Sequence, residues 1–187
     1  MKEEDQSACD IYTIGHSTRT EEALLALLTH YRIERLVDVR TVPKSRRVPH
    51  FNREHLQSLL PNHRIGYVHQ PALGGLRKSN DPRSPNQAWR NASFRGYADY
   101  MQTREFEEGL DRFLSERLGK RTALMCAEAV PWRCHRMLIS DALSVRGFSV
   151  CHILSLKEVK PHVITSFAKV EGKKVTYPLP QDQTLLF

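Results

Sequence analysis

The sequence predicts a single α/β domain, in which a mostly parallel sheet carries helices on both faces in a Rossmann-like, three-layer arrangement. Short runs rich in β-branched residues alternate with amphipathic helical patterns along the chain. Gly, Pro or polar clusters separate these runs, and 187 residues suit one domain with a substantial core. We expect a flexible N-terminus at 1–9, the α/β domain at 10–170 and a C-terminal tail at 171–187.

The expected elements follow this alternation in order. Strands are expected at 10–15, 35–40, 64–69, a run ending at 126, 148–154 and an edge strand at 163–170. Helices are expected at about 20–31, from Asn52 to a stop at Pro61, at 103–118 and at about 134–145. Thr18 and Glu21 have the spacing of a capping box for the first helix. The stretch at 71–95 is expected to be an irregular loop, of the length that serves as a lid or binding loop.

Composition limits the class of protein. The chain has 28 Lys and Arg against 21 Asp and Glu, a net charge of +7, which favours nucleic acid or a nucleotide as partner. No apolar run approaches the roughly 18 residues that cross a bilayer, and no signal-peptide pattern opens the sequence. We therefore expect a cytoplasmic protein without membrane contact. Four cysteines are too few for a disulfide scaffold, so reduced thiols are expected.

Candidate site residues lie after the expected strands, because ligands bind outside the carboxyl ends of parallel strands. The richest stretch follows the fourth strand, which ends at Cys126. Glu128 lies in the loop, and Cys134, His135 and Arg136 open the next helix. A helix N-terminus and a neighbouring Arg lower the pKa of a thiol such as Cys134, although cysteines in such positions are buried and inert about as often.

Two earlier strand ends also carry polar residues. His16 and Ser17 lie at a strand-to-helix turn. Either Ser17 and its neighbour only cap the helix, or the turn binds a phosphate or carboxylate with His16 as donor or proton carrier. Asp38 interrupts the second strand and Arg40 closes it. A buried acid must pair with a neighbouring Arg or face a polar site, and both can hold.

Two loops add candidate contacts. The segment 31–53 has seven Lys or Arg against two acids, and its loop, which contains Ser45, is either a solvated basic face or a phosphate-contacting surface. The stretch 71–95 contains Gly74 and Gly75. Aromatic residues lie near its basic residues, and they either stack on bases or anchor the loop to the core; they are Trp89, Phe94 and Tyr97.

The motifs at these positions resemble those of a known family. The motifs Gly15-His16-Ser17, Asp38-Val39-Arg40, Leu73-Gly74-Gly75, Cys126-Ala127-Glu128 and Cys134-His135-Arg136 occur in this order between about Ile11 and Leu156. The series resembles that of the domain-of-unknown-function family numbered 488. The resemblance implies a single α/β domain and directs attention to these positions, but it names no substrate and no reaction.

The residue types favour carboxylate chemistry over thiol chemistry. Glu128 and Asp38, at two strand ends, could act as acid and base, or as nucleophile and acid, at a glycosidic bond of a nucleotide or damaged base. Alternatively, they only pair with neighbouring arginines. The rival chemistry uses thiols, because Cys126, followed by a loop and Arg133, loosely resembles the cysteine loops of rhodanese-like sulfurtransferases and cysteine phosphatases. Its spacing is one residue too long and the loop lacks glycine.

Metal binding is not expected, and no other cofactor is. Five potential ligands could converge, but they show neither Cys-x-x-Cys nor His-x-x-x-His spacing: Cys126, Cys134, His135, Cys151 and His152.

The chain ends Gln183-Thr184-Leu185-Leu186-Phe187 after a polar, Pro-containing segment. This pentapeptide resembles the bacterial sliding-clamp-binding motif, a glutamine followed by apolar residues that end in Leu-Phe. Gln183, Leu186 and Phe187 match, whereas Thr184 stands where leucine is common. The resemblance implies the DNA sliding clamp as a partner; the alternative is that these apolar residues dock back on the domain.

The sequence thus predicts an enzyme of DNA or nucleotide metabolism, a hydrolase or glycosidase-type enzyme acting on damaged nucleic acid. A thiol-based enzyme and a non-catalytic nucleic-acid-binding module remain alternatives. The expected catalytic residues are Glu128, Asp38, Cys134 and His16. The expected substrate contacts are Ser17, Arg40, Ser45, Gly74, Gly75, Cys126, His135 and Arg136.

Overall fold

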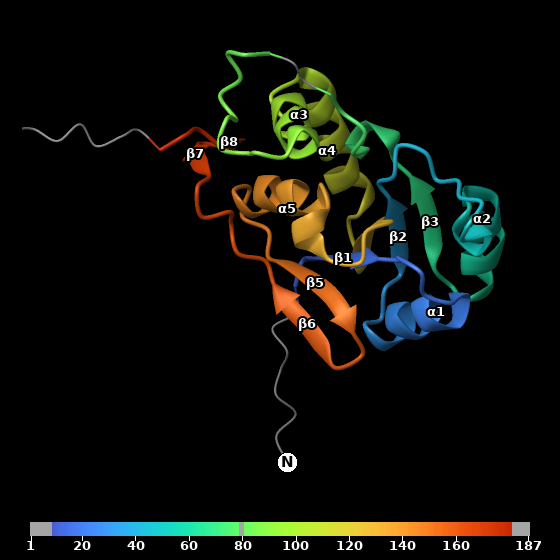
Figure 1. The fold of residues 1–187 in the computed structure, drawn as a ribbon. Coiled ribbons are helices and arrows are strands. Elements are labelled where there is room, and N and C mark those ends of the chain that lie inside the picture. The colour runs from blue at the N-terminus through green and yellow to red at the C-terminus, as the bar shows by residue number, and fades with distance from the viewer. Residues whose placement is uncertain (1–8, 79–80, 181–187) are drawn as a thin grey trace, which may run out of the picture.

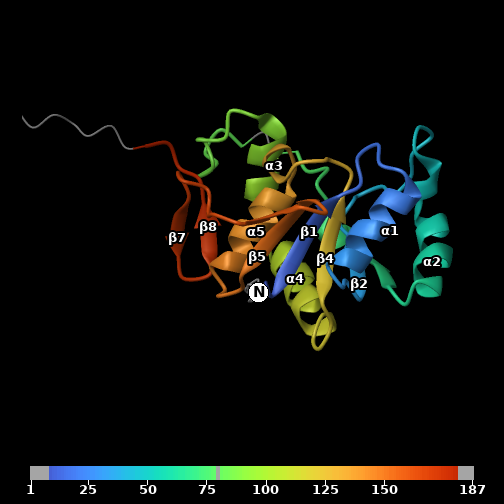
Figure 2. The same cartoon turned by 90° about the horizontal axis from the view of Figure 1, so that it is seen from below.

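The middle layer of the molecule is a sheet (Figures 1 and 2). Residues 9–78 and 81–180, which the computed structural model describes, form its six strands. In spatial order these are β3 (Gly66–His69), β2 (Arg35–Asp38), β4 (Thr122–Cys126), β1 (Ile11–Gly15), β5 (Val150–Ser155) and β6 (Glu158–Pro161). The first five are mutually parallel, and β6 runs antiparallel to β5.

Helices cover both faces of this sheet, so the predicted three-layer α/β fold is confirmed. Helices α1 (Glu21–His30) and α2 (Arg53–Asn62) pack on one face. Helices α3 (Ala92–Tyr100), α4 (Arg104–Glu116) and α5 (Arg136–Ser144) pack on the other, and Figure 1 shows α5 and α1 on opposite sides of β1. Side chains alternate between the two cores along each strand, and Cys126 belongs to the α5 side.

The sheet order places three strand ends together. Strands β2, β4 and β1 are neighbours, and they end at Asp38, Cys126 and Gly15. From β2 the chain leads through α2 to β3 at one edge of the sheet, whereas from β4 it leads through α5 to β5, toward the opposite edge. Neighbouring parallel strands whose connections diverge leave a crevice at their carboxyl ends, which is where α/β sheets bind ligands.

Gly15 ends β1 directly against the loop that follows β4. A Cβ atom at this position would lie only 1.9 Å from the backbone oxygen of Glu128. The amide of His16 donates to the carbonyl of Cys126 at 3.0 Å and continues the parallel pairing beyond the strand. The two chain segments therefore cross in backbone contact, and a residue with a side chain does not fit at position 15.

Several helix boundaries differ from expectation for local reasons. Helix α1 is capped by Thr20, whose hydroxyl accepts from the amide of Ala23 at 3.2 Å, and not by Thr18. Helix α2 continues through Pro61, and Asn52 at its start accepts instead from the amide of Ser45 at 2.6 Å. Helix α4 begins as expected, with Thr103 as its cap.

The stretch at 71–95 contains more structure than expected. A 3-10 turn, η2 (Pro71–Leu73), opens it, and α3 starts within its last residues. Asn91 caps α3 by accepting from the amides of Ser93 and Phe94 at 2.9 and 3.3 Å. The helix escapes the sequence pattern because Gly96 lies on its buried face, where a large apolar residue would complete the periodicity.

The C-terminal part of the domain departs from the predicted edge strand at 163–170. The edge is β6, which follows β5 through a two-residue turn, Leu156-Lys157, that lacks the usual glycine or asparagine signal. A separate hairpin is formed by β7 (Lys169–Glu171) and β8 (Lys174–Thr176). After it, Tyr177 is fully buried in the core on the α5 side, so packing continues beyond residue 170.

Two of the four cysteines form a disulfide, which corrects the expectation of four reduced thiols. Cys9 lies just before β1 and Cys151 lies in the neighbouring strand β5, with Cα atoms 5.9 Å apart. The parallel pairing of the two strands brings them within disulfide range, a long-range effect that cysteine counting does not reveal. Cys126 and Cys134 are free and buried.

Within 9–78 and 81–180, the helices are all too short or too polar to cross a lipid bilayer.

Candidate functional site

A groove runs over the carboxyl ends of β2, β4 and β1. It consists of two pockets that share Arg40, Val42, Ala127 and Glu128. The inner pocket, about 300 Å³, is lined in addition by Thr41, Gly75, Leu76, Ser93, Phe94, Cys126, Arg133, Cys134 and His135. The outer pocket, about 480 Å³, is lined in addition by His16, Ser17, Thr18, Lys44, Ser45, Arg47 and Val48.

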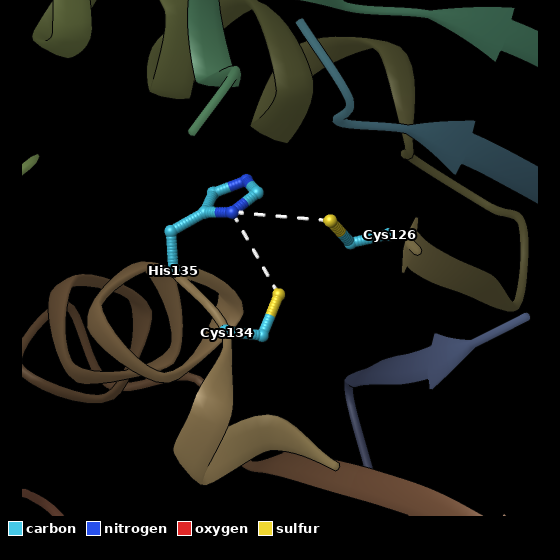
Figure 3. A group of neighbouring side chains, drawn as sticks. All are labelled: Cys126, Cys134 and His135. Atoms are coloured by element: carbon cyan, nitrogen blue, oxygen red, sulfur yellow. Dashed lines mark hydrogen bonds between the residues drawn. The ribbon is translucent and has the colours of Figure 1, made fainter. Parts of the chain in front are cut away.

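Two thiols and one imidazole meet at the wall of the inner pocket (Figure 3). Cys126 is the last residue of β4, Cys134 follows the 3-10 turn η3 (Pro131–Arg133), and His135 is the residue before α5. The Nδ1 atom of His135 lies 3.9 Å from the Sγ of Cys126 and 3.7 Å from the Sγ of Cys134. The loop between β4 and α5 therefore brings its two ends close together at this wall.

The hydrogen bonds of His135 fix its tautomer. Its Nε2 lies 3.1 Å from the carbonyl oxygen of Val39, which can only accept, so Nε2 carries the hydrogen. In the neutral ring Nδ1 is then a bare acceptor facing both sulfurs. Tyr97 packs on one side of the ring at a centroid distance of 4.9 Å, and a Cβ at Gly75 would lie 2.3 Å from Nδ1. Gly75 thus makes room for the imidazole.

Arg136 forms a hydrogen bond with the thiol of Cys134. The guanidinium is almost completely buried; its Nε donates to the Sγ of Cys134 at 3.3 Å and its Nη2 donates to the backbone oxygen of Glu128 at 2.6 Å. Burial raises the pKa of Cys134, but the hydrogen bond with Cys126 and the charge of Arg136 outweigh it and hold this pKa well below its usual value. The same hydrogen bond, together with burial, raises the pKa of Cys126. Of the two thiols, Cys134 is therefore the one whose surroundings favour the thiolate.

A chain of buried hydrogen bonds continues from Arg136 to the far side of the domain. Arg136 Nη1 lies 3.5 Å from the hydroxyl of Thr13, which lies 2.7 Å from Nδ1 of His152. The Nε2 of His152 lies 3.0 Å from Nδ1 of His162, and Nε2 of His162 lies 2.8 Å from Oδ1 of Asp141. Burial lowers the pKa of His152 to about 3, so this histidine is neutral. Each group in the chain consequently donates to the next one, from Arg136 through Thr13, His152 and His162 to Asp141.

Sequence reasoning missed this network. Asp141 is fully buried and accepts four hydrogen bonds, from His162, from the amide and hydroxyl of Thr165 and from the hydroxyl of Tyr177. The available signal was the position of Asp141 next to Ala142 on the apolar stripe of the predicted helix, where an acid needs partners. The partners themselves come from the segment after β6 and from the residue after β8.

Asp38 and Arg40 form a buried pair beneath the groove. Asp38 is completely buried and accepts from the amide of Arg40 at 3.1 Å, from its Nε at 2.8 Å, from its Nη2 and from the hydroxyl of Tyr67 at 2.8 Å. Arg40 in turn lines both pockets. Of the alternatives that the sequence left open for Asp38, pairing with a neighbouring arginine is present: its carboxylate is enclosed by Arg40 and Tyr67 and positions the guanidinium.

His16 is held neutral between two partners. Arg40 Nη1 donates to Nε2 of His16 at 3.1 Å, so the ring hydrogen is on Nδ1, which donates to the backbone oxygen of Ser17 at 2.9 Å. Burial and then the charge of Arg40 lower the pKa of His16 to about 4. Both ring nitrogens are engaged, so His16 orders the wall of the outer pocket.

Glu128 is the acid that faces the groove. It is exposed, it lines both pockets, and its hydrogen bond runs through its backbone oxygen to Arg136. Among the residues that the structure describes, its carboxylate has no hydrogen-bond or ion-pair partner. A carboxylate in this state can accept or deliver a proton at the junction of the two pockets.

The remaining predicted contacts mostly shape the walls. Ser17 has a positive φ of 49° and lines the outer pocket, and the hydroxyl of Ser45 accepts from the amides of Arg47 and Val48 at 3.2 Å. A Cβ at Gly74 would lie 2.5 Å from Oγ1 of Thr41. The three residues of the expected clamp-binding motif lie outside the described residues; they are Gln183, Leu186 and Phe187.

The three aromatic residues near the basic loop have separate places. Tyr97 is fully buried and donates its hydroxyl to the carbonyl of Leu73 at 2.9 Å. Trp89 packs against Phe94, Phe167 and Tyr177, with ring centroids 4.8 to 5.4 Å apart. Of the three, Phe94 is the one that lines the inner pocket. Tyr97 and Trp89 are therefore anchors to the core.

The fold and the groove define an α/β protein with a crevice at the carboxyl ends of its parallel strands. The family model described as "Domain of unknown function DUF488" matches residues 20–143, which is more than half of the chain. The protein belongs to this family, as the motif series predicted. Neither the curated proteins nor the solved structures gave a match.

Proposed function

We propose that the protein is a hydrolase that binds one nucleotide unit, free or within nucleic acid, and uses Glu128 as its general acid and base. The observation that carries this proposal is the carboxylate of Glu128 at the junction of the two pockets, which has no hydrogen-bond or ion-pair partner within 9–78 and 81–180. The inner pocket has apolar walls that suit a nucleobase, and the outer pocket has positive charges that suit a phosphate.

The inner pocket suits a base. Its walls include the side chains of Val42, Leu76 and Phe94, and about 300 Å³ lies at the lower end of the range for small-ligand sites. An aromatic ring at the wall offers a stacking surface to any base. The hydroxyls of Thr41 and Ser93 add polar groups that fix the orientation of a bound ring.

The outer pocket suits a phosphate. Lys44 and Arg47 are exposed on its wall, and Arg40 lies between the two pockets. Glu128 is the acid of this wall among the residues described. Cations that surround a nucleotide backbone supply most of the sequence-independent affinity for nucleic acid, and the net charge of +7 acts in the same direction.

The proposed reaction needs one acid–base group. Glu128 accepts a proton from an attacking water, whose oxygen bonds to the electrophilic atom of the substrate. The bond between that atom and the leaving atom breaks, and Glu128 returns the proton to the leaving atom. A mechanism with two carboxylates receives less support, because Asp38 is occupied by Arg40 and Tyr67.

The test is turnover by a Glu128→Gln variant. The substrates are single-stranded oligonucleotides carrying uracil or hypoxanthine, their unmodified counterparts and the corresponding nucleoside monophosphates, with products identified by mass. We expect a loss of roughly 10²-fold or more in turnover with binding retained. Glu116→Gln, an exposed acid on α4, is the matched control. Equal turnover in Glu128→Gln would refute the proposal, and binding without turnover of any substrate would favour a non-catalytic module.

A thiol-dependent enzyme is the second candidate. It is favoured by the contact between Arg136 and Cys134 and by the lowered pKa of that thiol, because both favour the thiolate, which is the nucleophilic form of cysteine. A Cys134→Ser variant that loses turnover while Glu128→Gln keeps it, with a covalent adduct on Cys134 in the parent protein, would favour this route.

The C-terminal pentapeptide supports a further part of the proposal, recruitment to DNA by the sliding clamp. This support comes from the sequence alone. Deleting Leu186 and Phe187 should abolish retention of the protein on an immobilised bacterial clamp, measured by surface plasmon resonance. Deleting Met1 and Lys2 is the matched control. Unchanged retention after loss of the last two residues would show that the pentapeptide is not the clamp-binding segment, and absence of retention of the parent protein would remove the clamp as a partner.

A further inference from the structure

Cys126, Cys134 and His135 have the separations of a metal-binding set. The two Sγ atoms and Nδ1 of His135 all lie within 4.8 Å of one another. Tetrahedral zinc with Zn–S bonds of about 2.3 Å and a Zn–N bond of about 2.0 Å requires neighbouring donor atoms about 3.6 to 3.8 Å apart. The two S–N distances here are 3.9 and 3.7 Å, within a few tenths of an ångström of these values, and the two Sγ atoms lie within 4.8 Å of each other.

The orientation of His135 matches that of a metal ligand. A coordinating imidazole usually donates its second N–H to a carboxylate or carbonyl, which fixes the ring and keeps the coordinating nitrogen unprotonated. His135 makes this contact through Nε2 to the carbonyl oxygen of Val39. Gly75 leaves space for the ring and Tyr97 packs against it, so the lone pair of Nδ1 points at the sulfurs without a rearrangement.

Arg136 supports the same arrangement. A guanidinium has no lone pair to offer a metal, and Arg136 Nε donates to the Sγ of Cys134. Hydrogen bonds to a coordinating thiolate are the kind of outer contact that tunes a metal site. The buried guanidinium also offsets part of the negative charge of two thiolates.

The set is open on one side. Within 9–78 and 81–180, no fourth His, Cys, Asp or Glu joins the three donors. All three residues line the inner pocket. Zinc sites with three protein ligands and a free fourth position are catalytic in type, whereas structural sites are closed by four protein ligands.

We propose that Cys126, Cys134 and His135 bind one divalent metal ion, zinc by the softness of its two sulfur donors, with the fourth position open to the inner pocket. The metal site stands on the ligand geometry alone. Its link to Glu128 rests on the proposed function: both would act on the same water, the ion by polarising it and the carboxylate by taking its proton.

The experiment measures metal directly. The untagged full chain is stripped of metal under reducing conditions and then titrated with Co²⁺ followed by ZnSO₄. We expect one Co²⁺ per chain, with thiolate-to-cobalt charge-transfer bands and the intense visible absorption of tetrahedral cobalt, and displacement by one equivalent of zinc. Absence of these bands in the parent protein, or fewer than one equivalent of zinc by elemental analysis after ZnSO₄ exposure, would overturn the proposal.

Variants locate the ion. Cys126→Ser and His135→Ala should lose the charge-transfer band or most of the bound metal, with folding checked by circular dichroism. The exposed His63→Ala and the double variant Cys9→Ser with Cys151→Ser should keep one equivalent. Unchanged metal in both ligand variants would overturn the assignment. Glu128→Gln should also keep one equivalent, so loss of activity and loss of metal are distinguishable.

Discussion

His16 couples the folding of the site to pH. Three charged groups act on its ring, namely Arg40, Asp38 and Arg136, and burial together with Arg40 lowers its pKa from 6.5 to about 4. The unfolded chain therefore binds the extra proton between about pH 6.5 and 4, so the contribution of neutral His16 to stability is complete above this window and is lost as pH falls through it. The loss amounts to about 3 kcal/mol at the lower end.

A His16→Gln variant tests this coupling, because its amide oxygen can still accept from Arg40 but does not titrate. Urea unfolding between pH 7 and 4 should show a flatter fall in the free energy of unfolding for His16→Gln than for the parent. His63→Gln, at an exposed histidine, should reproduce the parent slope. Identical slopes for parent and His16→Gln would contradict the assignment of a neutral, buried ring.

Gly15 gives a second prediction at the scale of one residue. In Gly15→Ala the added Cβ would lie 1.9 Å from a backbone oxygen, and one of the two crossing segments would have to move. We expect a loss of about 2 kcal/mol or more and a Tm lower by about 5 °C in a thermal scan. Gly66→Ala, whose nearest atom is 3.7 Å away, should change stability by less than about 0.5 kcal/mol. Equal effects of the two substitutions would argue against the crossing.

Individual residues show how far the sequence could predict the site. The positions of His16, Arg40 and Glu128 followed from strand ends, because a parallel sheet brings such ends to one edge. The sequence did not show whether the carboxylates of Asp38 and Glu128 are paired or free. Asp38 is occupied by Tyr67, which comes from β3, and that contact depends on strand order, which apolar patterning does not encode.

At the scale of elements, the loop between β4 and α5 is organised by its two ends. Cys126 ends the strand and Arg136 begins the helix, and the bond from Arg136 to the backbone oxygen of Glu128 spans the loop. Local patterns predicted the strand and the helix because both have strong apolar periodicity. They missed the β7–β8 hairpin, whose short strands are mostly exposed and whose anchor, Tyr177, follows the last strand.

Tyr177 allows this anchoring to be measured. Its hydroxyl lies 2.7 Å from Oδ2 of Asp141, and both groups are buried. In Tyr177→Phe one bond to a buried carboxylate is lost while the ring packing remains, so we expect a loss of about 1 to 3 kcal/mol in chemical denaturation. Tyr12→Phe, in the other core, removes a hydroxyl that makes no such bond to any residue the structure describes, and it should cost less than about 0.5 kcal/mol. A neutral Tyr177→Phe would mean that the hairpin is not held through Asp141.

The whole molecule combines a sheet that gathers three strand ends with a surface charge that favours anions. The order of the strands determines which side chains meet at the groove. Arg40 and the basic loop follow β2, Cys126 ends β4 and Glu128 follows it, and His16 follows β1. The fold class was predictable from alternation along the chain. The order β3-β2-β4-β1 was not, because it is decided by packing between elements that are far apart in sequence.

Charge at this scale gives a prediction that separates the groove from the general basicity of the protein. Replacing Lys44 and Arg47 by Ala removes two cations from the outer pocket, whereas replacing Lys173 and Lys174 removes the same charge from the β7–β8 hairpin. If a nucleotide backbone lies in the groove, binding of a fluorescent single-stranded oligonucleotide should weaken in the first variant. Its logarithmic dependence on salt should become shallower by roughly 1.4, about 0.7 for each lost phosphate contact. The second variant should keep a slope close to that of the parent. Equal changes in the two variants would show that net charge, and not the groove, attracts the nucleic acid.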